Sequence, residues 1–179
     1  MMVDLKGRQL MPQLSEYTKG NLIVPSDLKR EGVAETAESL NLLLADVFAL
    51  YLKTKSFHWH ISGPHFRDYH LLLDEQAAQI FAMSDAVAER TRKIGGVTLR
   101  SISDISRHQR LRDNNDASLS ATDMLAELCS DNKQLTAFLR VTHEVASGND
   151  DVATASLIEN WIDESERRTW FLAAALADS

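Results

Sequence analysis

The chain has 179 residues, of which 26 are acidic and 19 basic, so its formal net charge is -7, and 44% of its residues are hydrophobic. This globular composition predicts one domain with a sizeable core and excludes a disordered, collagen-like or disulfide-framed chain. The acidic balance argues against a protein whose whole surface binds nucleic acid, and suits a cationic partner such as a metal ion. A single cysteine, the lack of a bilayer-spanning run and the lack of a secretory signal favour a cytoplasmic location.

Apolar residues recur at helical spacing in four long segments, and no proline follows Pro64. The first segment, 31–60, ends at a Ser-Gly-Pro turn, and the second, 66–94, ends at a pair of glycines. The third begins at a Ser120 or Thr122 cap and stops at Gly148. The fourth begins at an Asp150 or Asp151 cap and carries apolar residues as far as position 172.

The connection between the second and third segments is longer than twenty residues, which is too long for a simple bundle loop. We expect a short helix within 101–110 and a turn at the Asp/Asn-rich stretch 113–116. The sequence therefore predicts an all-α, ferritin-like four-helix bundle with a short helix in its long crossover. We assign 1–30 to an N-terminal extension and 31–179 to the bundle domain.

Histidines cluster where the first segment meets the second. Four of the six, His58, His60, His65 and His70, lie within thirteen positions. Imidazole is both a common metal ligand and an ordinary hydrogen-bonding group, so the cluster alone leaves both roles open.

The second segment carries two metal-capable pairs, His70 with Asp74 and Asp85 with Glu89, each spaced i, i+4 on one helix face. At about 100° per residue all four side chains share one stripe, but the midpoints of the pairs are about 22 Å apart. One helix cannot wrap both pairs around one ion. A second copy packed antiparallel across a two-fold axis would join them, which predicts a symmetric dimer with two equivalent interface sites.

The ligand types narrow the choice of metal. Mixed imidazole and carboxylate donors suit iron, zinc or manganese better than calcium or magnesium. The chain contains no Glu-x-x-His, so a di-iron site within one bundle is not predicted. The alternative interpretation is a solvated helix face, on which Asp85 and Glu89 repel each other weakly.

The stretch 53–66, Lys-Thr-Lys-Ser-Phe-His-Trp-His-Ile-Ser-Gly-Pro-His-Phe, is followed by the two pairs described above and by the double glycine at 95–96. Together these residues closely resemble the Dps family, the DNA-protecting proteins of starved bacterial cells, which are miniature ferritins. The resemblance covers roughly residues 30–175. It implies a hollow shell of twelve subunits that oxidises Fe(II), often with hydrogen peroxide or oxygen, and stores the ferric mineral.

Carried over by position, the resemblance assigns His58, His70 and Asp74 to one half of the iron site, and Asp85 and Glu89 of the two-fold neighbour to the other half. It implies that the carboxylates capture Fe(II) while the histidines orient it.

Trp59 is similar to an aromatic residue near the family's site, where it intercepts stray oxidant, although interface packing explains it equally well. His60 stands where the family more often has asparagine. We expect His60 and His65 to be either additional metal ligands or histidines that are only exposed or hydrogen-bonded.

Several other residues outside the histidine cluster also have expected positions or roles. Carboxylates at the start of the last helix and along it either line a pore that draws cations inward or are only solvated; the candidates are Asp150, Asp151 and Asp163. His108 and His143 are expected at the surface or in packing, without a partner. Cys129 is expected to be buried, and Trp161 and Trp170 to lie in the core or an interface.

DNA compaction is the competing function that the resemblance suggests. Residues 1–30 hold five cationic and three acidic side chains, a net charge of +2, and the last four residues hold no cation. Because each neutralised phosphate needs its own cation, we expect weak, salt-labile DNA binding, with association to the nucleoid if it occurs. A third possibility is a helical assembly that sequesters metal or scaffolds partners without catalysis.

Overall fold

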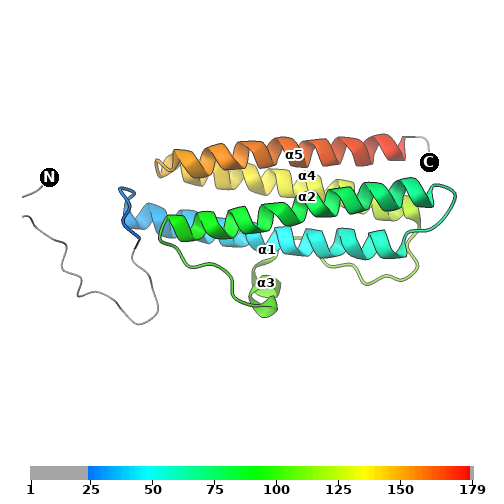
Figure 1. The fold of residues 1–179 in the computed structure, drawn as a ribbon, viewed down its shortest axis with the longest axis horizontal. Coiled ribbons are helices and arrows are strands. Elements are labelled where there is room, and N and C mark those ends of the chain that lie inside the picture. Colours follow the sequence, from blue (N-terminus) through cyan, green and yellow to red (C-terminus); the bar gives the residue numbers. More distant parts are fainter. Residues whose placement is uncertain (1–23, 178–179) are drawn as a thin grey trace, which may run out of the picture.

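The computed structural model describes residues 24–177, so most of the expected N-terminal extension lies outside the described residues. Four long helices, α1 (Arg30–His60), α2 (Phe66–Lys93), α4 (Ala121–Gly148) and α5 (Val152–Leu176), pack side by side as a bundle in which the long crossover makes α2 and α4 parallel, and both run antiparallel to α1 and α5 (Figure 1). A short helix, α3 (Ile102–His108), lies in the crossover beside α1. The described part of the chain contains no strand, and the predicted all-α bundle is confirmed.

The structure also settles the two helix starts that were left open. Ser120 caps α4 through a capping box with Asp123, and Asp151 caps α5 by accepting a hydrogen bond from the backbone N–H of Thr154. Between α1 and α2, Gly63 has a φ of 113°, a conformation that glycine adopts more readily than other residues. This turn sends α2 back along α1 and brings residues at the end of one helix beside the start of the next.

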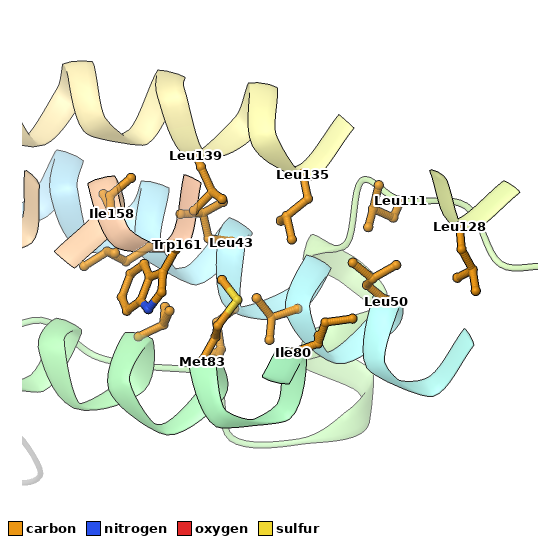
Figure 2. Close-up of a cluster of buried hydrophobic side chains, with 14 of the residues drawn as sticks. Leu43, Leu50, Ile80, Met83, Leu111, Leu128, Leu135, Leu139, Ile158 and Trp161 are labelled. Carbon is orange, nitrogen blue, oxygen red and sulfur yellow. The ribbon is translucent and has the colours of Figure 1, made fainter. Parts of the chain in front are cut away.

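The core is an apolar layer contributed by all four long helices. Leucines of α1 and α4 meet Ile80 and Met83 of α2 and Ile158 and Trp161 of α5 (Figure 2). Trp161 is therefore a core residue, whereas Trp170 is exposed in the single chain. Cys129 was expected to be buried, but it is only partly buried and packs at the edge of the core.

The crossover is fixed to α1 by a buried carboxylate. Asp46 accepts hydrogen bonds from the backbone N–H groups of Arg110, at 2.6 Å, and Leu111, at 3.1 Å, and from Nε of Arg110 at 2.8 Å. The Arg110 guanidinium also lies 3.8 Å from the centre of the Phe138 ring, a cation–π geometry. An acid that interrupts an apolar run is thus the anchor that holds the long crossover against the bundle.

Both remaining histidines have partners, contrary to the sequence expectation. Nδ1 of His108 lies 2.7 Å from the main-chain oxygen of Asp104, and Nε2 of His143 lies 3.1 Å from Oε1 of Glu159. The second contact joins α4 to α5, so only the packing of the two helices reveals it. No helix in the described residues combines the length and the hydropathy needed to cross a membrane.

Candidate metal centre

His58 and His70 form a reciprocal pair at the α1–α2 turn. His58 lies in the last turn of α1 and His70 in the first turns of α2. Nδ1 of His58 lies 2.8 Å from the main-chain oxygen of His70, and Nδ1 of His70 lies 2.9 Å from that of His58. The two rings stack with their centres 3.8 Å apart.

These hydrogen bonds set the tautomer of both rings. A carbonyl oxygen only accepts, so each Nδ1 must carry the hydrogen. In the neutral imidazole the lone pair then lies on Nε2, which is the arrangement that metal-binding histidines commonly show. Nε2 of His58 lies 3.8 Å from Oδ1 of Asp74, so this end of α2 brings together three of the predicted ligands.

Lys55 is the residue of this site that sequence reasoning missed. Its Nζ lies 2.7 Å from Oδ1 of Asp74, and this hydrogen bond and charge hold the pKa of the Asp74 carboxyl below its ordinary value. The position of Lys55 could have indicated its role, since it precedes His58 by three residues and therefore shares its helix face. A cation here keeps the carboxylate ionised and also competes with a metal ion for the same oxygen.

The other predicted pair, Asp85 and Glu89, lies farther along α2 and is exposed. Glu89 forms an i, i+4 ion pair with Lys93 at 2.8 Å, which lowers the pKa of the Glu89 carboxyl. At about 1.5 Å per residue, the midpoints of the two pairs, which are fifteen positions apart, are separated by about 22 Å. Within residues 24–177, no three carboxylate, imidazole or thiol side chains are arranged to hold a metal ion.

Three other predicted site residues lie around the turn without joining the ligands. Trp59 and His60 are exposed, and Nδ1 of His60 lies 2.7 Å from the main-chain oxygen of Ser56. His65 is exposed and its ring makes a tilted contact with Tyr69. The structure thus gives His60 and His65 ordinary hydrogen-bonding or aromatic surroundings.

An apolar groove of about 630 Å³ runs between α1 and α3, next to the α1–α2 turn with its flanking histidines, residues 58–70, which we call the histidine turn. Large apolar side chains line it and are strongly exposed: Leu52 and Trp59 at 59%, and Ile102 at 80%. Apolar surface gathered in this way is typical of a protein–protein interface.

The three pore candidates have different surroundings. Asp150 and Asp163 are exposed, and Asp150 has a φ of 60°. Asp151 is buried, caps α5 and lies 2.5 Å from Nη2 of Arg90. The Asp151 carboxylate is therefore already used in contacts that hold the fold together. Of the three candidates, Asp150 and Asp163 present their carboxylates at the surface of the single chain.

Comparison with known proteins gives matches over most of the chain. A ferritin-like domain model matches residues 37–179. A low temperature-induced protein of Nostoc sp., described as uncharacterized, is 36% identical over 149 residues, which cover 82% of this chain and 81% of the relative. DNA protection during starvation protein 1 of Deinococcus radiodurans is 31% identical over 162 residues, which cover 90% of this chain and 78% of the relative.

The solved structures agree with the fold. The Dps protein of Vibrio cholerae O1, described as a member of a broad superfamily of ferritin-like diiron-carboxylate proteins, aligns with a TM-score of 0.80 and 25% identity, covering 87% of this chain and 99% of that protein. The histidine turn, the carboxylate stripe of α2 and the helical crossover all lie within the region that matches the family model. The chain belongs to the ferritin-like family and, within it, to the Dps proteins.

Proposed function

We propose that this protein is a ferroxidase and iron store, which oxidises Fe(II), with hydrogen peroxide as its principal oxidant, and keeps the ferric product inside a hollow cytoplasmic shell. The observation that carries the proposal is the reciprocal hydrogen bonding of His58 and His70, because it leaves both Nε2 lone pairs free for a metal ion. With the Asp74 carboxylate beside His58, they would contribute to a mixed nitrogen and oxygen donor set that Fe(II) accepts and that zinc or manganese would also occupy.

One chain supplies only half of the proposed site. A two-fold partner whose α2 runs antiparallel would bring its own Asp85 and Glu89 to the histidine end of this chain. The apolar groove beside the turn supports this arrangement, since Leu52 and Trp59 would be covered when the partner docks. Burying these side chains would also exclude water from the site.

The proposed reaction balances with two iron ions as substrates. Each Fe(II) gives up one electron, and one hydrogen peroxide molecule accepts both electrons while its O–O bond breaks, which yields two hydroxide ions. Because both electrons are transferred together, no hydroxyl radical is released. Lys55 and Lys93 hold Asp74 and Glu89 in the ionised form that attracts the cations.

Trp59 is proposed to act as a sacrificial reductant. Its indole lies next in sequence to His58, so in the docked dimer it would stand beside the site, where it is placed to intercept an oxidant that leaves the iron. His60 and His65 are proposed only as accessory ligands for excess iron, because their contacts in the single chain need no metal.

The shell is proposed to contain twelve copies, built from the two-fold dimers that complete the sites. Twelve times 20.0 kDa gives a particle of 240 kDa, and twelve times -7 gives a formal charge of -84. Part of that charge would face the interior, where carboxylates attract and nucleate iron. Asp150 and Asp163 remain candidates for the carboxylates that line its entry pores.

The test is the rate of ferric absorbance after Fe(II) and hydrogen peroxide are added to the apoprotein. Asp74→Asn should slow the initial oxidation by about 10- to 100-fold, because it removes one anionic ligand. Asp68→Asn is the matched control, since it makes the same change at an exposed position in the first turn of the same helix. Wild-type rates no faster than buffer, with Fe(II) still bound, would indicate metal sequestration without catalysis.

DNA binding is the alternative function, and the name of the Deinococcus radiodurans relative, DNA protection during starvation protein 1, favours it. The net charge of -7 opposes it, and the +2 of residues 1–30 offers few phosphate contacts. We therefore expect the protein to retard duplex DNA in a gel only at low ionic strength. Complete retardation that persists at about 0.15 M salt would rank DNA binding above iron oxidation as the primary function.

A further inference from the structure

A buried cation lies inside the bundle. Arg168, on α5, is 1% exposed, and although the charge of Glu164 one turn earlier acts on it, no carboxylate of residues 24–177 forms an ion pair with it. Burial lowers the pKa of its guanidinium to about 10, so the group still carries its charge at neutral pH. A buried charge needs hydrogen bonds or water to replace its lost hydration.

The protein satisfies only part of this guanidinium. Nε donates to Oδ1 of Asn132 on α4 at 2.8 Å, and Nη2 makes a weak contact with Sδ of Met83 on α2 at 3.9 Å. Nη1 is buried and has no hydrogen-bond partner. One face of the cation therefore still offers unused donors.

Two unused acceptors lie on α2 in the same region. Gln76 is 2% exposed, and its Nε2 is directed to the main-chain oxygen of Arg168 at 3.4 Å, which leaves its Oε1 without a partner. Nε2 of Gln79 donates to Oε1 of Glu75 at 3.2 Å, and the buried Oε1 of Gln79 is likewise unpaired.

These three residues line one small cavity of about 20 Å³ between α2 and α5. A cavity needs roughly 10–15 Å³ to hold one water molecule, and buried waters typically make about three hydrogen bonds. A water accepts from one donor and gives its two hydrogens to two acceptors, which matches one guanidinium N–H and two amide oxygens. A halide would suit the guanidinium, but both amide oxygens would repel it.

We propose that the cavity between α2 and α5 is a binding site for one structural water, which accepts a hydrogen bond from Nη1 of Arg168 and donates to Oε1 of Gln76 and of Gln79. The water hydrates the buried cation and joins α5 to α2. Gln76 and Gln79 lie between Asp74 and Asp85 along α2, so this bridge helps to fix the helix that carries both pairs of proposed ligands. The proposal does not depend on iron oxidation.

The test is a crystal structure of the whole assembly at a resolution that orders single waters, with a second crystal soaked in bromide. We expect water density within about 3.2 Å of Nη1 and of both amide oxygens, and no anomalous peak. An empty cavity, a bromide peak, or a water that does not contact Nη1 would overturn the proposal.

A variant gives an independent check. The double substitution Gln76→Leu with Gln79→Leu removes both acceptors, so the water should disappear while Arg168 stays in place. Gln134→Leu, at an exposed position of α4, is the control and should keep the water. A fully occupied water in the double variant would contradict the bridging role of the glutamines.

Discussion

His58 and His70 each hydrogen-bond through Nδ1 to the main-chain oxygen of the other, at 2.8 and 2.9 Å, so that each ring is oriented by the residue with which it would bind metal. The ends of two helices are thereby coupled through their side chains. This geometry is formed within a single chain, before any partner arrives, and it reduces the ordering that metal binding would otherwise require.

Replacing Lys55 should strengthen metal binding. In Lys55→Gln, the ammonium no longer competes for Oδ1 of Asp74, and an exposed ion pair of this kind corresponds to roughly a twofold to fivefold change in affinity. Calorimetric titration of the apoprotein with Zn(II) measures this change. Lys133→Gln, at an exposed position of α4, is the control and should leave the affinity unchanged. Equal or weaker binding by Lys55→Gln would show that the lysine does not compete.

The ion pair of Lys55 with Asp74 should also make stability depend on pH. Lys55 lowers the pKa of Asp74 below its ordinary value of 3.8, so the folded state holds this proton less tightly than the unfolded state. The stability contributed by the pair is therefore present above pH 3.8 and is lost as the pH falls through the lowered pKa. Infrared titration, with Asp74→Asn to assign the band, should show that Lys55→Gln raises the pKa of Asp74; an unchanged band would contradict the pairing.

A charge placed in the apolar groove should prevent subunit pairing. Leu52→Asp would bury an unpaired carboxylate in the proposed two-fold interface, so we expect at least about tenfold weaker association, together with slower Fe(II) oxidation. Sedimentation velocity measures the first effect. Ala34→Asp adds the same charge to an exposed position of α1 away from the groove, and it should preserve the native particle. An intact particle in Leu52→Asp would place the interface elsewhere.

Loss of the crossover anchor should lower stability. Asp46→Asn removes the charge that pairs with Arg110 and one acceptor of the backbone N–H groups, so unfolding in urea should require about 3 kcal/mol less free energy. Asp113→Asn changes an exposed carboxylate that accepts from Gln109, and its effect should stay within about 0.5 kcal/mol. Similar stability of the two variants would mean that Asp46 does not hold the crossover.

Sequence patterns predicted the helices well because helical periodicity and capping are local. The expected segments agree with α1, α2, α4 and α5 to within about two residues at the predicted ends, since most of these ends are marked by a cap, a glycine or a proline. The same helical periodicity predicted that the pairs His70–Asp74 and Asp85–Glu89 share one face of α2. The separation of those pairs along one helix also indicated, without any structure, that one chain is incomplete as a metal site.

Contacts across the bundle depend on how the helices pack, which no local pattern encodes. Only the tertiary structure shows that Lys55 pairs with Asp74, that His143 contacts Glu159 and that Arg168 lines a small cavity with two glutamines. It also showed that Asp46 anchors the crossover, although the sequence presents it only as an interruption of an apolar run. The helices and the metal-capable pairs on their faces could be predicted from the sequence, because both depend on residues that lie three or four positions apart. Packing decided which of those groups are oriented, ionised or buried, because those properties depend on neighbours that are distant in the chain.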